Sequence, residues 1–229
     1  IWLLYLIYRL VNIHQITTNF PLDYDNDLAS YMAYIFFLLQ CGFNNLCSYW
    51  YNGFYPFYHY SPAYFILTLP IYYLTKNILI SVFISMVSLF VIALLISFSL
   101  GKNQNFSFSK KILFFSLAFA NPFIISSYVK LGRLPEFLGF LGILLIFSVM
   151  LKYLEKPLDK KFYITFLPSY VLLMLSHPQM TLLGHLLILG FLIIKNNKER
   201  IKIILASIVG LILSSFWLIN YLKYNLLGG

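Results

Sequence analysis

The sequence predicts an all-α membrane protein: a polytopic bundle of transmembrane helices with a large extracytoplasmic first loop that carries interfacial helices. Of the 229 residues, 61% are hydrophobic and only 10% are charged, whereas soluble domains carry about 25% charged and about 45–50% apolar residues. Long apolar runs recur along the chain without the period-two alternation of barrel strands. The composition excludes a water-soluble enzyme and a disordered chain, and the pattern excludes a β-barrel.

The apolar runs predict about seven membrane crossings. The clearest is the uncharged run 77–100, which covers about 34 Å of helix and so exceeds the ~30 Å hydrocarbon core. We expect the other spans at residues 1–12, 112–129, 137–151, 162–176, 180–194 and 203–222. Because the chain begins inside an apolar run, we take residues 1–229 as one transmembrane domain, the N-terminal part of a longer protein. Its expected divisions are the first span 1–12, an outer loop 13–76 and six further spans in 77–229.

Lys and Arg residues indicate which connections face the cytoplasm, because cytoplasmic loops are enriched in them. None occurs between Arg9 and Lys76, whereas eleven lie in three later clusters. The clusters are Lys102, Lys110 and Lys111; Lys152, Lys156, Lys160 and Lys161; and Lys195, Lys198, Arg200 and Lys202. We therefore expect the clusters inside and the loop 13–76 outside. The net charge of +9 is then a topology signal, and no nucleic-acid partner is predicted.

This topology has two consequences. If residues 62–75 crossed the membrane, the three clusters would face outward, so we expect that segment to lie along the outer interface. The potentially reactive side chains then gather on the outer face: Asp23, Asp25, Asp27, Glu136, His14, His59 and His177. We expect four outer residues to line one cavity: Asp27, Arg133, Glu136 and His177. His185 lies in mid-span, and we interpret it as a hydrogen-bonded core histidine.

Asp27 opens the apolar stretch 28–40, which ends just before Gly42. This pattern predicts an interfacial helix with Asp27 near its N-cap, so the carboxylate could serve only as a cap. Alternatively, Asp27 is a general base, with Asp25 as the second candidate. A third interpretation is a divalent metal site for Mg²⁺ or Mn²⁺ formed by Asp25, Asp27 and Glu136.

Half of residues 43–60 (FNNLCSYWYNGFYPFYHY) are aromatic. Such a stretch is typical of an interfacial aromatic belt, but it could also line a site for a sugar or an isoprenoid, with Trp50, Tyr58 and His59 as contacts. Cys41 and Cys47 could form a disulfide in this region, although their spacing alone leaves the pairing open.

Lys130, Arg133 and Glu136 form a charged cluster at the next outer turn. The charges could simply bound the adjacent spans. They could also clamp a diphosphate, since Arg makes bidentate phosphate contacts and Lys supplies a point charge. His177, between Ser176 and Pro178, is a further candidate contact at a third outer end.

The order of these features resembles the GT-C superfamily of membrane glycosyltransferases, and within it the 6-pyruvoyl-tetrahydropterin synthase-related membrane domain family. Five segments carry the resemblance: 26–28 (NDL), Trp50, 53–62 (GFYPFYHYSP), 132–137 (GRLPEF) and 176–178 (SHP). The resemblance covers nearly the whole chain, and the order and spacing of these segments carry it. Tyr31 stands about where the family pattern has a histidine after the aspartate.

The resemblance implies an inverting transfer of a sugar from a lipid-phosphate-linked donor, at the outer face of the plasma membrane. Asp27 or Asp25 would be the base, and Lys130 and Arg133 would meet the phosphate. The expected partners are the donor lipid and membrane lipids, and the oligomeric state is not predicted. The alternatives are an oligosaccharyltransferase-like subunit and a non-enzymatic transporter or scaffold; a transporter would be expected to have more polar residues in mid-span.

Overall fold

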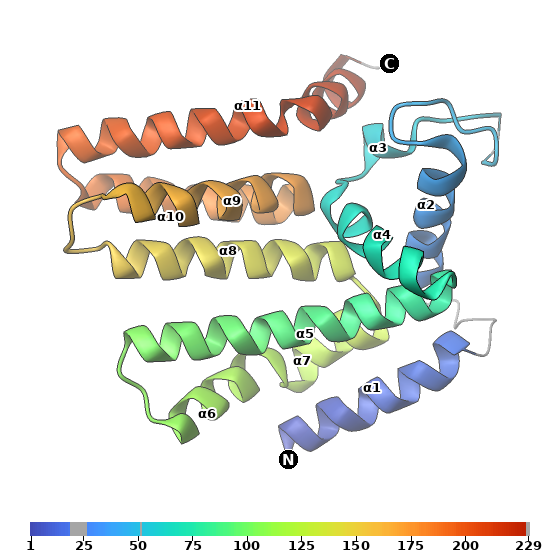
Figure 1. The fold of residues 1–229 in the computed structure, drawn as a ribbon, viewed down its shortest axis with the longest axis horizontal. Coiled ribbons are helices and arrows are strands. Elements are labelled where there is room, and N and C mark those ends of the chain that lie inside the picture. Colours follow the sequence, from blue (N-terminus) through green and yellow to red (C-terminus); the bar gives the residue numbers. More distant parts are fainter. Residues whose placement is uncertain (19–26, 51, 228–229) are drawn as a thin grey trace. The chain divides into compact units, whose positions relative to one another are not determined.

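The computed structural model describes residues 1–18, 27–50 and 52–227, which contain eleven α-helices and one π-helical turn (Figure 1). The predicted all-α class is therefore confirmed. In chain order the helices are α1 (Trp2–Thr18), α2 (Leu28–Cys41), α3 (Pro56–His59), α4 (Ala63–Thr75), α5 (Ile78–Asn103), α6 (Phe108–Phe119), α7 (Pro122–Ile125), the π-helical turn η1 (Ser126–Lys130), α8 (Leu134–Lys152), α9 (Lys160–Ser176), α10 (Pro178–Ile194) and α11 (Asn197–Leu227). Asp23 and Asp25, two of the candidate carboxylates, lie outside the described residues.

Three helices, α5, α8 and α11, are long and apolar enough to cross a membrane, which indicates a membrane protein. A fourth span exists if α6 and the segment Pro122–Lys130, bent by 50°, count as one. The prediction of seven spans is therefore wrong. Helices α1, α9 and α10 have 17 residues each, or about 25 Å of helix, which is less than the ~30 Å hydrocarbon core.

The predicted span 112–129 is broken in the middle. Asn121 caps a new helix, with its side-chain oxygen accepting a hydrogen bond from the Ile124 N–H at 3.0 Å, and Pro122 occupies the first helical position. Proline favours that position because it has no N–H to satisfy there. The chain then widens into the π-helical turn η1, a geometry that is frequent at functional sites.

The segment 62–75 contains α4, whose 13 residues amount to about 20 Å, too short to cross the hydrocarbon core. This length agrees with the prediction that the segment does not span. The Ser85 hydroxyl in α5 donates a hydrogen bond to Thr68 in α4 at 3.0 Å, which ties the short helix to the long one.

The chain divides into two compact units. Unit 1 comprises residues 1–56 and 64–137, and in it α5 contacts α1, α2 and α6. Unit 2 comprises residues 57–63 and 138–229, and in it α9 contacts both α10 and α11 (Figure 1). The core of unit 2 contains a column of stacked rings from Phe162, Phe166 and Tyr170, one turn apart on α9.

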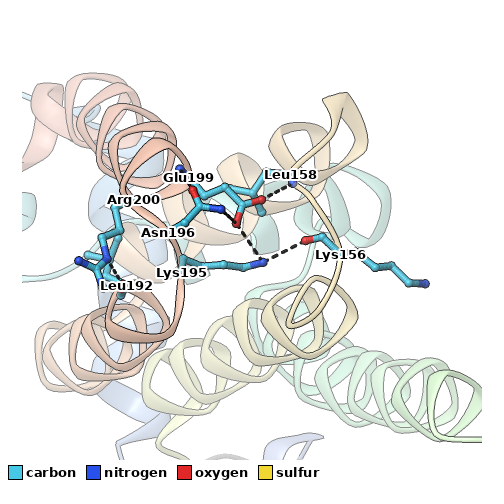
Figure 2. Close-up of polar contacts among 7 residues, drawn as sticks. All are labelled: Lys156, Leu158, Leu192, Lys195, Asn196, Glu199 and Arg200. Carbon is cyan, nitrogen blue, oxygen red and sulfur yellow. Dashed lines mark hydrogen bonds and ion pairs between the residues drawn. The ribbon is translucent and has the colours of Figure 1, made fainter.

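A polar network joins the α8–α9 and α10–α11 connections of unit 2 (Figure 2). The Lys195 ammonium lies 3.4 Å from Glu199 and donates to the Lys156 carbonyl at 2.9 Å. Glu199 also accepts from the Leu158 N–H at 3.0 Å. The two paired side chains are only 5% and 13% exposed, so the pair is held away from solvent.

Arg200 completes the network by donating to the Leu192 carbonyl in the last turn of α10 (Figure 2), and it also donates to the Ile193 carbonyl. These carbonyls have no intrahelical donor, and a cation at a helix C-terminus also complements the helix dipole. Lys195 and Arg200 therefore stabilise the connection between α10 and α11, in addition to indicating which side of the membrane it faces.

Candidate functional site

Asp27 lies at the N-terminus of α2, and Gly42 ends that helix with a φ of 77°. The predicted helix and its boundaries are thus confirmed, while its position at the membrane interface stays a prediction. The side chain of Asp27, however, makes no capping hydrogen bond. It accepts instead from the Tyr31 hydroxyl, one turn along α2, at 3.3 Å. Capping therefore does not account for the Asp27 carboxylate.

Tyr31 and Asp27 form a hydrogen-bonded pair in which the phenol is buried and the carboxylate is exposed. The Tyr31 side chain is 3% exposed, and its ring packs against Tyr64 and Phe65 of α4, whereas Asp27 is exposed. A buried, fixed phenol thus holds one oxygen of an accessible carboxylate and leaves further acceptor positions on it. An i,i+4 pair of this kind can be read from the sequence, because residues four apart share a helix face.

The backbone of Asp27 is bonded to the charged turn that follows η1. Its N–H donates to the Leu131 carbonyl at 2.8 Å. Next to Leu131, Gly132 has a φ of 71°, and a Cβ there would lie 2.6 Å from the Leu28 side chain. Only glycine allows both this backbone conformation and this close approach. The start of α2 and the turn 130–136 are therefore packed together.

That turn carries the three candidate phosphate-binding and acceptor-orienting residues. Lys130 ends η1 and is exposed. Arg133 lies 3.9 Å from Glu136 across one helical turn, with side chains 49% and 21% exposed. An ion pair that is this long and this exposed contributes little to stability. Little free energy is therefore lost when Arg133 leaves Glu136 to bind another anion.

The described residues contain no group of three or more His, Cys, Asp or Glu side chains able to hold a metal ion. Asp25, which the predicted metal set Asp25, Asp27 and Glu136 requires, lies outside them. Hard divalent cations prefer several oxygen ligands, and the described carboxylates do not supply such a set. No chemical step is therefore assigned to a metal ion.

Within the aromatic stretch, Cys47 is linked both to the end of α2 and to Phe54, all in unit 1. Cys41 and Cys47 form a disulfide with Cα atoms 5.4 Å apart, which settles the open pairing. Cys47 and Phe54 then exchange two backbone hydrogen bonds of 2.8 and 3.1 Å. Phe37 of α2 packs edge-on against Trp50 and Phe54, while Trp50 stays half-exposed. Part of this stretch is thus packed against α2, and Trp50 keeps an accessible face.

Unit 2 contains a cavity of about 290 Å³ that brings together three segments far apart in the sequence. It is lined by His59, Tyr60, Ser61, His177, Pro178, Gln179 and Tyr221. Two of the candidate contacts, His59 and His177, thus meet there, whereas Tyr58 is half-buried and does not line the cavity. Sequence reasoning did not identify Ser61, Gln179 or Tyr221, because no local pattern marks them.

A hydrogen bond and a ring contact connect α11 to the segment 59–60 beside the cavity. The Trp217 indole of α11 donates to the Tyr60 carbonyl at 3.1 Å, and the His59 ring meets Tyr224 with centroids 4.0 Å apart. Burial lowers the pKa of His59, so its imidazole is neutral near pH 7.

His185 bonds to Tyr170 and to the Thr181 carbonyl, each at 2.8 Å, as expected for a core histidine.

The predicted residues therefore fall into two groups, one in each unit. Asp27, Arg133 and Glu136 belong to unit 1, and His59 and His177 belong to unit 2. That His177 joins the first group in one cavity stays a prediction.

Comparison with known protein families, curated proteins and solved structures gave no match. The resemblance to the GT-C superfamily accordingly rests on the residues quoted for it.

Proposed function

We propose that the chain is a membrane glycosyltransferase domain that transfers a sugar from a lipid-phosphate-linked donor at the outer face of the plasma membrane. The hydrogen bond from the Asp27 N–H to the Leu131 carbonyl carries this proposal. Through it, an accessible carboxylate at the start of an apolar helix lies beside a turn that bears two cations and a second carboxylate. Transfer of a sugar from a phosphate leaving group requires a base for the acceptor hydroxyl and a nearby group that binds the phosphate.

Two observations support an outer position for the loop before α5. It contains the Cys41–Cys47 disulfide, and disulfides persist in oxidising compartments. It also has no basic residue between Arg9 and Lys76, whereas the lysine clusters lie in later connections. A count of four spans, with α6 and Pro122–Lys130 taken as one, keeps this topology, because the helix pair α9 and α10 returns the chain to the same side whether or not it crosses.

In the proposed reaction, an acceptor hydroxyl attacks the anomeric carbon of the donor sugar as the bond to the lipid phosphate oxygen breaks. The hydroxyl proton passes to the Asp27 carboxylate, and the electron pair of the broken bond leaves with the phosphate. Tyr31 fixes the orientation of Asp27. Arg133 and Lys130 bind the phosphate of the donor, and Glu136 orients the acceptor.

The test is Asp27→Asn in the full-length protein, with glycan product measured in membranes of a deletion strain that carries each variant. Loss of a general base costs about 100- to 10,000-fold in rate, and Asn preserves the size of the side chain. Glu155→Gln, which neutralises an exposed carboxylate in the α8–α9 connection, is the matched control and should leave the product unchanged. If Asp27→Asn gave full product, the role of base would be assigned to Asp25 instead. If the variant with both Asp25 and Asp27 replaced gave full product, the proposal would be refuted.

A further inference from the structure

We propose that the cavity in unit 2 binds a small oxyanion, a phosphate or a phosphate monoester, at the N-terminus of α10. This site lies in a different unit from Asp27 and does not depend on the proposed glycosyl transfer. The argument starts from the helix end itself. His177 is the N-cap residue of α10, and its side chain makes no capping hydrogen bond. The first N–H groups of a helix have no intrahelical acceptor and carry a partial positive charge, which favours an anion.

A second, independent observation comes from the facing segment. The Ser61 side chain is 1% exposed and lines the cavity, and its hydroxyl oxygen has no hydrogen-bond partner among the described residues. Burying a hydroxyl without a partner costs free energy, so native structures rarely keep one without a reason. A bound oxyanion would accept the hydrogen bond from this hydroxyl.

The charge of the lining decides between an anion and a neutral sugar. No Asp, Glu, Lys or Arg is among the described residues that line the cavity. The donors available are the Ser61 hydroxyl, the Gln179 amide and two imidazoles. No carboxylate is present in this lining to repel an anion, and every polar side chain in it is able to donate a hydrogen bond. The volume of about 290 Å³ is at the lower end of the range for small-ligand pockets, which suits a phosphate-sized group.

Protonation should strengthen the site. The titratable groups that face the cavity are His59, His177, Tyr60 and Tyr221, and the Tyr224 ring contacts His59. Lys223 lies on α11 near them but does not line the cavity. As the pH falls, a neutral imidazole gains a proton and becomes a charged donor, so anion affinity should rise.

The first experiment measures inorganic phosphate binding to the purified full-length protein at pH 7.5 by calorimetry. Ser61→Ala should weaken binding about 10-fold or more, because it removes a hydrogen bond to a charged ligand. The variant should fold at least as well as the parent, since it removes a buried hydroxyl that has no partner. The matched control is Ser214→Ala. Ser214 is a buried serine of α11 that donates to the Gly210 carbonyl of its own helix and does not line the cavity, so phosphate binding should not change. Equal affinity in Ser61→Ala, or no binding by the parent, would overturn the proposal.

The second experiment uses sulfate, which keeps its charge from pH 6 to 8, so that any pH dependence belongs to the protein. Affinity should rise as the pH falls, and His59→Phe, which retains a ring against Tyr224, should reduce that rise. A flat profile in the parent would contradict the role of the imidazoles and the proposal with it.

A third experiment repeats the phosphate titration in nanodiscs. Competition by phosphatidic acid, but not by phosphatidylcholine, assigns the site to a lipid headgroup, and its absence assigns the site to a free oxyanion.

Discussion

At the scale of single residues, the most informative contact is the one between Tyr31 and Asp27. The sequence identified the aspartate and the start of its helix correctly, because a polar residue before an apolar run and a glycine after it are local signals. It did not predict how the carboxylate is used. The spacing of four residues places Tyr31 on the same helix face as Asp27, but the fixed position of the phenol that donates to it depends on burial against α4, which is a tertiary feature.

Arg133→Ala should weaken donor binding more than it slows the chemical step. We expect KM for the lipid-linked donor to rise while kcat changes little, because a phosphate contact that is equal in the ground and transition states contributes only to binding. Steady-state kinetics of the purified enzyme with a short-chain donor measures both quantities. A fall in kcat at constant KM would instead assign Arg133 to stabilisation of the transition state.

At the scale of elements, Gly132 decides how closely α2 approaches the charged turn. The nearby Lys130 and Arg133 gave a sequence signal for charge at a helix boundary but none for contact with α2. The two segments meet because Leu28 occupies the space that a side chain at position 132 would need. Such packing between distant segments has no signature in local periodicity.

Gly132→Ala should lower both stability and transfer without altering any charge. A positive φ costs a non-glycine residue about 1–2 kcal/mol, and the added methyl group would push Leu28 away and lengthen the bond from Asp27 to Leu131. Thermal unfolding and product formation measure the two effects. Gly190→Ala is the control, because among the described residues no atom beyond the local backbone of α10 lies within 4 Å of a Cβ at that position; a similar loss there would show that the effect is general.

The network of Lys195 and Glu199 joins two connections of unit 2. Glu199→Ala should destabilise the protein by roughly 3 kcal/mol, because it leaves a buried ammonium without its partner and removes the acceptor of the Leu158 N–H. Chemical denaturation in detergent measures the change. Glu199→Gln should recover part of the loss by keeping an oxygen for that N–H. If the alanine variant were as stable as the parent, the pair would be structurally neutral.

At the scale of the whole molecule, hydropathy predicted the helical class and the positions of most helices. It overestimated the number of crossings for reasons visible in particular residues. Asn121 and Pro122 break the run 112–129, and the runs that became α9 and α10 form helices of 17 residues. Apolar composition marks residues that avoid water, but it does not separate those facing lipid from those packed in a core.

The topology can be tested with a single cysteine. Gln104→Cys lies in the exposed connection between α5 and α6, and both native cysteines are already paired. We expect a membrane-impermeant maleimide to label this cysteine only after permeabilisation, because Lys102 and Lys111 mark the connection as cytoplasmic. Labelling in intact cells would reverse the topology and would also remove the argument against residues 62–75 crossing the membrane.

The burial of Lys195 also gives the protein an internal chemical reporter. An amine-acylating reagent can reach the exposed Lys198 and Lys202, but Lys195, at 5% exposure and bonded to Glu199 and to the Lys156 carbonyl, is shielded. Acylation needs a free, uncharged amine, so modification of Lys195 requires that the network first open. After a brief exposure to the reagent, the unmodified share of Lys195 in a peptide digest therefore records the fraction of molecules in which this network is closed, in any detergent or bilayer and without knowledge of the substrate.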